Sequence, residues 1–253
     1  MSDHPKGSPM DSPGYVILSR LGAQLRATQV LANNLANAET PGYRATRAVF
    51  AQHLQPQRDV ADGRIGVAYA TDRATWRDTA QGPVSSTGNP LDVAIRGEGY
   101  FAVETPEGER YTRAGRFTLD QDGRLTDMEG HPVLDARGTP LAFAPNDSRI
   151  EIQGDGTIRS ENGVIGRLRV VRFDDPQRLR AEGDRLFASD DAAQPVERPN
   201  LVQGAVEGSN VRPVLELTQL TAELREFQFA AQFAEREGER LQTAVDRILR
   251  RRS

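Results

Sequence analysis

The feature of this sequence that most constrains its fold is an unbroken apolar period in the C-terminal third. A heptad pattern of this kind indicates a helix that packs along one side against another helix. Pro213 suits the first turn of the helix, and Ser209 or Asn210 can cap its N-terminus. A helix from Pro213 to Arg251 would be about 58 Å long, so it needs a partner along its length. The residues of the period are Leu217, Leu220, Leu224, Phe227, Ala231, Ala234, Gly238, Leu241, Val245 and Ile248.

A second helix with the same spacing is predicted over residues 15–37. It ends at Thr40-Pro41-Gly42, because proline disfavours the helical conformation in the residue before it. The chain between the helices leaves the first helix and enters the second at the same end of the pair. We therefore expect the two helices to pair as an antiparallel coiled coil, with Leu35 opposite Leu217. From Gly238 onward the C-terminal helix extends beyond its companion. The period of the first helix consists of Leu18, Leu21, Leu25, Thr28, Ala32 and Leu35.

Between the two helices the apolar period becomes that of β-strands. Alternating runs predict strands at residues 91–95, 100–103, 117–119, 149–152 and 168–171, and glycine-containing turns separate them. We therefore predict an α+β fold with long paired N- and C-terminal helices and a central antiparallel β-rich domain. The expected boundaries are an N-terminal helical segment at 10–45, an extended connector at 46–90, the β-rich domain at 91–206 and the C-terminal helix at 207–253.

Charge and cysteine content exclude several classes of function. Lys and Arg total 32 against 36 Asp and Glu, with both signs interspersed, which argues against nucleic-acid binding and against a polybasic membrane surface. No segment reaches the ~20 apolar residues that span a bilayer, and residues 1–12 lack the apolar core of a signal peptide. Without other information, these two absences predict a cytoplasmic protein. The chain has no cysteine and hence no disulfides or thiolate ligands. Residues 1–9 are interpreted as an upstream extension or a misassigned start.

The sequence shows no arrangement suited to catalysis or to binding a cofactor or metal. Residues 97–102 match G-x-G-x-x-A, but a strand follows where a nucleotide site needs a helix, so we interpret them as a tight turn. Residues 120–123 lack the glutamate of a calcium loop, and His131 has neither a second imidazole nor a nucleophile nearby. Trp76 is interpreted as a packing anchor. We predict that the protein is not an enzyme.

Three blocks of the sequence resemble the rod-and-hook protein family of bacterial flagella. They are residues 33–43 at the end of the first helix, residues 89–101 with 111–115 in the β-rich region, and residues 203–211 before the last helix. The similarity covers nearly everything from Met10 to Ser253. Three matched blocks are hard to obtain by chance.

The resemblance implies a function and a location. Residues 10–12, 130–134 and 165–168 look most like the proximal rod proteins, distal rod proteins are the alternative, and a hook protein would carry a larger insertion. The implied protein is a non-enzymatic subunit of the basal-body rod, exported by the flagellar type III apparatus without a cleaved signal peptide into the periplasmic rod. That location replaces the cytoplasmic one. The implied partners are other rod proteins, copies of the same chain and the export apparatus, with no nucleic acid, no cofactor and no membrane insertion.

The residues expected to contact neighbouring subunits form two groups. The helix seam consists of Leu18, Leu21, Leu25, Leu35, Leu217, Leu220, Leu224 and Phe227, with Leu241, Val245 and Ile248 beyond it. The helix end consists of Asn33, Asn34, Asn37, Thr40 and Gly42. An intramolecular core is the alternative for all of them, because a seam satisfied within one chain has the same sequence. Two other classes stay open: a β-rich enzyme, which would turn over a substrate, and a soluble coiled-coil adaptor, which would form a small defined oligomer.

Overall fold

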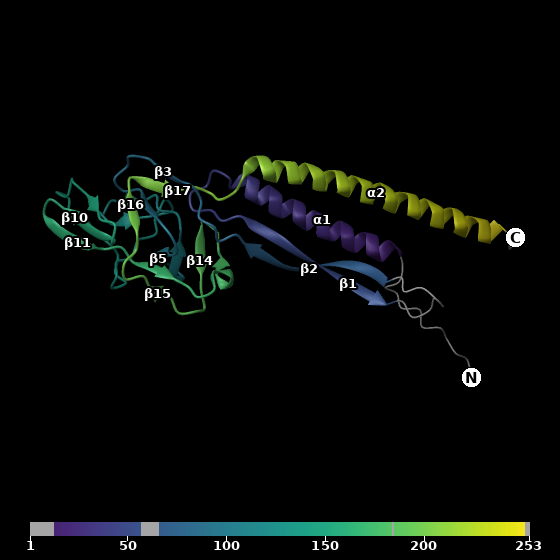
Figure 1. Ribbon diagram of the computed structural model, residues 1–253, viewed down its shortest axis with the longest axis horizontal. Helices are drawn as coiled ribbons and strands as arrows, with labels where there is room; N and C mark the ends of the chain where they lie inside the picture. The colour runs from purple at the N-terminus through teal and green to yellow at the C-terminus, as the bar shows by residue number, and fades with distance from the viewer. Residues whose placement is uncertain (1–12, 57–65, 184, 251–253) are drawn as a thin grey trace, which may run out of the picture. The chain divides into compact units, whose positions relative to one another are not determined.

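The structure, a computed structural model, describes residues 13–56, 66–183 and 185–250 (Figure 1). These residues form two compact units. The helical unit comprises the described residues among 13–35, 46–76 and 213–250, and the β unit comprises residues 36–45 and the described part of 77–212. Over the ranges that the structure describes, no helix combines the length and apolar character needed to cross a membrane.

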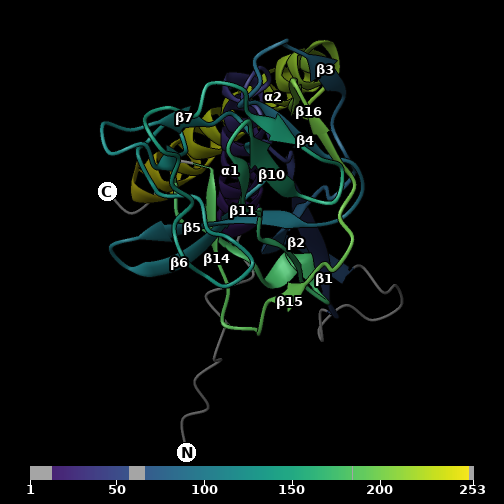
Figure 2. The ribbon, with the colours of Figure 1, turned by 90° about the vertical axis from the view of Figure 1, so that its left-hand side faces the viewer.

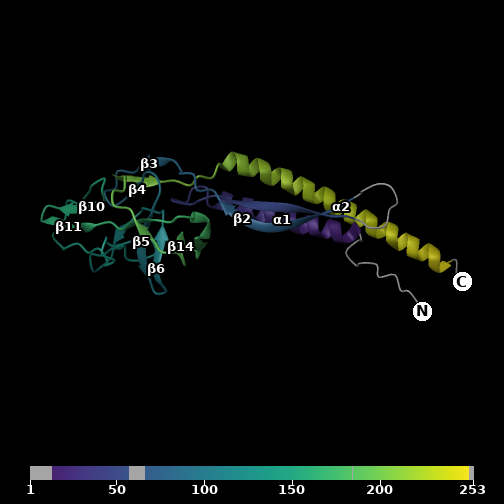
Figure 3. The same ribbon diagram turned by 60° about the horizontal axis from the view of Figure 1, so that its bottom comes forward.

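The helical unit contains both helices and a two-stranded ribbon. Helix α1 spans Pro13–Ala36 and α2 spans Pro213–Arg250, while strands β1 (Thr46–Pro56) and β2 (Gly66–Arg77) pair with each other. In Figures 1 and 3, α1 lies lengthwise beside the ribbon and beside α2, and α2 continues beyond α1. Much of the segment interpreted as an extended connector, residues 46–90, therefore forms a ribbon along the first helix.

The predicted coiled coil of the two terminal helices is wrong. The helices run in opposite directions, since Asn34 contacts Glu216 while Gln24 contacts Glu226. These contacts are made by polar side chains, whereas Leu217 of the expected seam is 54% exposed. A coiled coil requires apolar side chains of both helices to interlock along a continuous seam. The apolar residues of the expected seam therefore do not interlock between the two helices of this chain.

The physical reason lies in the face that α1 buries. Its buried residues are Gln24, Ala27, Leu31 and Asn34, each one position before a residue of the predicted period. The three-four spacing is present, but the buried face is rotated by about 100° around the helix axis. Residues of α1, β1 and α2 line a cavity of about 340 Å³ where a coiled coil would have interlocking layers. Helix α1 therefore divides its buried face between the ribbon and α2.

The β unit is built on a six-stranded antiparallel sheet with the order β13-β14-β6-β5-β12-β15. Its central hairpin joins β5 to β6, with Phe101 opposite Thr112 and Thr105 opposite Gly108. The strands are β5 (Tyr100–Thr105), β6 (Gly108–Thr112), β12 (Val170–Arg172), β13 (Arg180–Ala181), β14 (Leu186–Ala188) and β15 (Gln194–Pro195).

Four smaller sheets complete the described part of this unit, which Figure 2 shows facing the viewer. Strands β16 and β17 pair with β4 and β3, so the chain just before α2 lies beside residues 84–95. The other two sheets are β9-β10-β11 and β7-β8. The bounds are β3 (Val84–Ser86), β4 (Val93–Ile95), β7 (Thr118–Leu119), β8 (Leu125–Thr126), β9 (Glu151–Ile152), β10 (Thr157–Ser160), β11 (Gly163–Arg167), β16 (Leu201–Gln203) and β17 (Ala205–Glu207), with a 3-10 turn at Pro176–Arg178.

The core of the β unit lies on both faces of β5. Alternate residues of a strand point to opposite faces. Accordingly, Phe101 and Val103 belong to one apolar cluster, and Tyr100 and Ala102 belong to another. The ring of Phe101 packs edge to face on Phe117, with 5.2 Å between the ring centres. The β-rich body expected between the helices is thus present.

Candidate assembly interface

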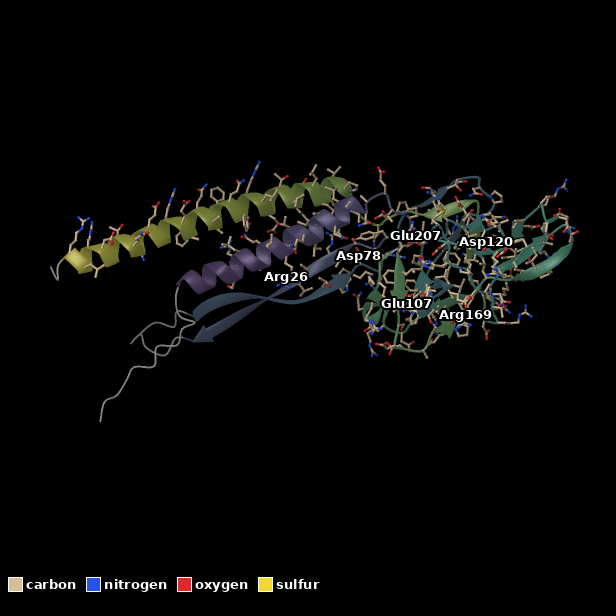
Figure 4. All side chains as sticks on the ribbon, turned by 180° about the vertical axis from the view of Figure 1, so that it is seen from behind. Arg26, Asp78, Glu107, Asp120, Arg169 and Glu207 are labelled. Atoms are coloured by element: carbon tan, nitrogen blue, oxygen red, sulfur yellow. The ribbon has the colours of Figure 1, made fainter. Side chains whose placement is uncertain are left out.

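Helix α2 exposes large apolar side chains on two sides. Phe229 and Phe233 are 72% and 60% exposed and lie one turn apart on the side that also carries Leu215. Leu217 and Leu224 are 54% and 45% exposed and lie two turns apart on another side. Figure 4 shows side chains of α2 projecting away from α1 along its length. Clustered apolar side chains of this size usually mark a surface that another protein covers.

The structure divides the predicted seam residues into three groups. Of the described side chains, none is fully buried, so an intramolecular core does not account for the most exposed ones. Leu25, Leu217 and Leu224 are exposed; Leu21, Leu35, Leu220 and Phe227 are half-buried; the side chains of Leu18, Leu241, Val245 and Ile248 lie outside the described residues.

The residues at the end of α1 act mainly within the chain. Asn33 is exposed, whereas Asn37 and Thr40 are half-buried, and Oγ1 of Thr40 donates to Oδ1 of Asn37 at 3.2 Å. Gly42 is buried with φ +72°, and a Cβ at this position would lie 2.5 Å from the backbone nitrogen of Ala114. Only glycine tolerates that turn and that close approach.

Asn34 is buried in the helical unit, and its side-chain amide hydrogen-bonds to the backbone of Thr46 as a neighbouring strand would. Its Nδ2 donates to the Thr46 carbonyl at 2.8 Å, and its Oδ1 accepts from the Thr46 amide at 2.9 Å. The same Nδ2 lies 3.2 Å from Oε2 of Glu216, whose Oε1 accepts from Arg47 at 2.5 Å. This network connects α1, β1 and α2. Asn34 can therefore reach a neighbouring subunit only if the helical unit opens.

Asn210 connects three segments of the β unit. Its Oδ1 accepts from the Ala45 amide at 2.7 Å, and its Nδ2 donates to the carbonyls of Asp78 and Ala80 at 3.0 and 2.9 Å. Helix α2 begins three residues later at Pro213, so the prediction that Ser209 or Asn210 caps the helix is wrong. The side chain is engaged with neighbouring backbone instead.

A buried ionic cluster lies beside Asn210 in the sequence. Glu207, labelled in Figure 4, accepts from Nε of Arg113 at 3.0 Å and pairs with Nη2 of Arg44 at 2.8 Å. All three side chains are more than nine-tenths buried. Burial lowers the pKa of Arg44, and the charge of Arg113 acts in the same direction, while Glu207 opposes both effects. One carboxylate therefore serves two guanidinium groups.

The motifs that resembled catalytic or binding sites are turns. Gly97 and Gly99 have φ of +95° and +134° and join β4 to β5, as the sequence predicted. The ring of His131 lies 2.9 Å from Asp127, whose other carboxylate oxygen accepts from the His131 amide at 2.8 Å, which closes a turn. The side chains that the structure describes include no group of three that could ligate a metal.

The charged residues of these networks were not predicted from the sequence. Arg44, Arg47 and Arg113 fall in no periodic pattern. A signal did exist for Glu216, which lies on the same face of α2 as Leu220. A carboxylate on an apolar face is rarely buried unless it is paired, so it predicts a cationic partner.

Comparisons with known families match most of the chain. Residues 94–160 match the family described as flagellar hook protein FlgE/F/G D1 domain. Residues 15–44 match the flagella basal body rod protein family, and residues 202–247 match the C-terminal family of flagellar basal body rod FlgEFG proteins.

Individual relatives extend the similarity over nearly the full length. The chain is 35% identical to the flagellar basal-body rod protein FlgF of Caulobacter vibrioides, over 94% of this chain and 98% of the relative. It is 37% identical to FlgF of Mesorhizobium japonicum, over 86% and 89% of the two chains. The identity to the rod protein FlgG of Agrobacterium fabrum is 33%, over 82% and 88%.

Proposed function

The chain belongs to the family of flagellar basal-body rod proteins, and we propose that it enters the rod through the exposed apolar residues of its terminal helices. It is a structural subunit of the flagellar basal body, not an enzyme, and is most similar to FlgF. The proposal is carried by the exposure of Leu217, Leu224, Phe229 and Phe233 on α2. Covering such side chains is a main source of association free energy.

The proposed partners are other rod proteins and further copies of this chain. Head-to-tail contacts that do not close on themselves generate a helical tube, which suits a rod. In this arrangement Leu25 of α1, together with the exposed residues of α2, contacts neighbouring subunits. Asn34 and Gly42 shape the helix end from inside the chain.

We further propose export by the flagellar type III apparatus and a periplasmic location in the rod. Membership of the rod family supports both. Mass spectrometry of the chain in purified basal bodies tests export without cleavage, and the expected result is that the N-terminal peptides are retained. Loss of a segment of signal-peptide length would contradict the proposal.

Charged substitutions on α2 test the assembly surface. Leu224→Asp and Phe233→Asp replace exposed side chains, so each is expected to change the free energy of unfolding by only about 0.5 kcal/mol. In the assembled rod the same charges would be buried against a neighbour, at a cost of several kcal/mol. We therefore expect a folded but non-motile double variant that is absent from purified basal bodies.

A matched substitution separates this effect from a general effect of charge on α2. Gln232→Asp also places a carboxylate at an exposed position of the same helix, but it removes no apolar side chain. We expect it to swim normally. Normal swimming by the Leu224→Asp, Phe233→Asp double variant would refute the role of these residues in assembly.

A further inference from the structure

We propose that a cavity in the β unit binds a carboxylate group. The cavity has a volume of about 230 Å³, and its lining includes Arg44, Arg113, Arg172 and Tyr100. Two of these arginines belong to the buried ionic cluster around Glu207.

The first argument is the pairing in this cluster, where two buried guanidinium groups share one directly paired carboxylate. Arg44 and Arg113 are 7% and 3% exposed, and they share the single carboxylate of Glu207. In the described part of the chain, Nε of Arg44 is buried without a hydrogen-bond acceptor. Nη1 of Arg44 donates to the carbonyls of Thr79 and Ala80, so the unused Nε donor is the group whose burial costs free energy. An anion in the adjoining cavity would add negative charge beside both guanidinium groups.

The second argument is the set of donors that the cavity offers. Arg172 is exposed and lines the same cavity, so it adds a positive charge at a hydrated position. Burial raises the pKa of Tyr100, although nearby arginines act in the opposite direction. The hydroxyl therefore keeps its proton at neutral pH and can donate a hydrogen bond. Guanidinium and hydroxyl groups together are well suited to bind a carboxylate.

The cavity favours a singly charged carboxylate over phosphate. Glu98 is exposed and also lines the cavity, so its negative charge repels a dianion more than a monoanion. The rings of Tyr100 and Phe173 supply apolar wall for the methylene groups of an acidic side chain. The occupant is an acidic side chain of a neighbouring rod subunit, a step that rests on the proposed function.

Acetate provides a direct test on the full chain. Sodium acetate is titrated against sodium chloride at constant ionic strength, and the Nε–H resonances of the arginines are followed by 15N-correlated NMR. We expect the Arg44 resonance to shift saturably with acetate but not with chloride. No shift, or an equal shift with chloride, would overturn the proposal. Tighter binding of inorganic phosphate than of acetate would overturn the assignment to a carboxylate.

Two exposed substitutions with opposite expected effects sharpen the test. Arg172→Gln is expected to weaken acetate binding about two- to fivefold, the size typical of an exposed charge interaction. Glu98→Gln is expected to strengthen it by a similar factor, because it removes a like charge. Arg149→Gln, an exposed arginine that does not line the cavity, is expected to leave the affinity unchanged. A loss of folded protein cannot weaken acetate binding in one variant and strengthen it in the other. Equal acetate affinity in all variants would refute the site.

Motility tests the source of the carboxylate separately. A strain carrying Arg172→Glu is expected to assemble fewer rods and to swim less than one carrying Arg149→Glu. Normal swimming of the Arg172→Glu strain would overturn the neighbouring subunit as the source, even if the isolated chain binds acetate. Conversely, normal swimming of the α2 double variant would refute the proposed assembly surface without changing the acetate result.

Discussion

Two carboxylates, Glu207 and Glu216, are less than 2% exposed. Glu207 pairs with two buried guanidinium groups, and Glu216 pairs with the partly exposed guanidinium group of Arg47. A buried carboxylate without partners is strongly destabilising, because it loses its hydration without compensation. Each carboxylate therefore determines where other segments lie. Glu216 holds the start of β1 and the end of α1 beside α2, and Glu207 holds Arg44 beside Arg113.

The role of Glu216 is testable by removing its charge. Glu216→Gln leaves the Arg47 guanidinium, which is partly exposed, without its carboxylate, and we expect the free energy of unfolding to fall by about 2 kcal/mol. Glu226→Gln on the same helix alters a pair in which both side chains are about 60% exposed, and we expect a change below about 0.5 kcal/mol. Urea unfolding followed by circular dichroism measures both. Equal changes in the two variants would contradict a structural role for the buried carboxylate.

A surface carboxylate gives a prediction about pH. Hydrogen bonds from Ser148, first through its hydroxyl at 2.7 Å, and from the Arg149 amide lower the pKa of Glu161 from 4.5 to about 2. A pKa that is lower in the folded state adds stability above pH 4.5, and this contribution is lost as the pH falls toward 2. We expect Ser148→Ala to raise the pKa of Glu161 and to weaken the dependence of stability on pH in this range.

Carboxyl 13C titration by NMR measures the Glu161 pKa, and urea unfolding between pH 2 and about pH 5 measures the stability. Ser85→Ala removes an exposed hydroxyl from β3, which pairs with β17, so it serves as the control. An unchanged Glu161 pKa in Ser148→Ala would show that this hydroxyl does not stabilise the carboxylate.

At the scale of elements, the sequence predicts the existence of both helices and the β-rich body but not the face that α1 buries. Leu25 and Leu35 belong to one helical stripe and Leu31 to another, so periodicity alone cannot choose between them. The choice is made by the ribbon β1–β2, because Asn34 must face the start of β1 to bond with Thr46. That pairing is a tertiary contact that leaves no periodic signal.

The turn after α1 tests how strongly this element is constrained. Gly42→Ala places a methyl group against the backbone of Arg113 and Ala114 at a positive φ, so we expect destabilisation of at least about 2 kcal/mol. Gly88→Ala has a similar φ of +75° with open space around it, and we expect only the cost of the left-handed conformation, about 1 kcal/mol. Urea unfolding of the two variants separates the clash from the strain, and equal losses would argue against the close approach.

At the scale of the whole molecule, the two units differ in what holds them together. The β unit has apolar clusters on both faces of β5, and these follow from the alternation that the sequence shows. In α2 the only fully buried residue among the described side chains is Glu216. The length of α2 was predictable, but the exposure of its leucines was not, because a seam closed within one chain and a seam closed by a neighbour have the same sequence.

Hydrogen exchange distinguishes these two ways of closing the seam. In the free chain, the described side chains of α2 beyond Glu226 are exposed or half-buried, so we expect its amides to open locally, whereas those of β5 open only with the core. We expect exchange in α2 to be at least about 100-fold faster than in β5. Incorporation into basal bodies should cover Phe229 and Phe233 and slow exchange in α2, with β5 little changed. Exchange in α2 that is equally fast before and after incorporation would show that its apolar residues do not contact a neighbouring subunit.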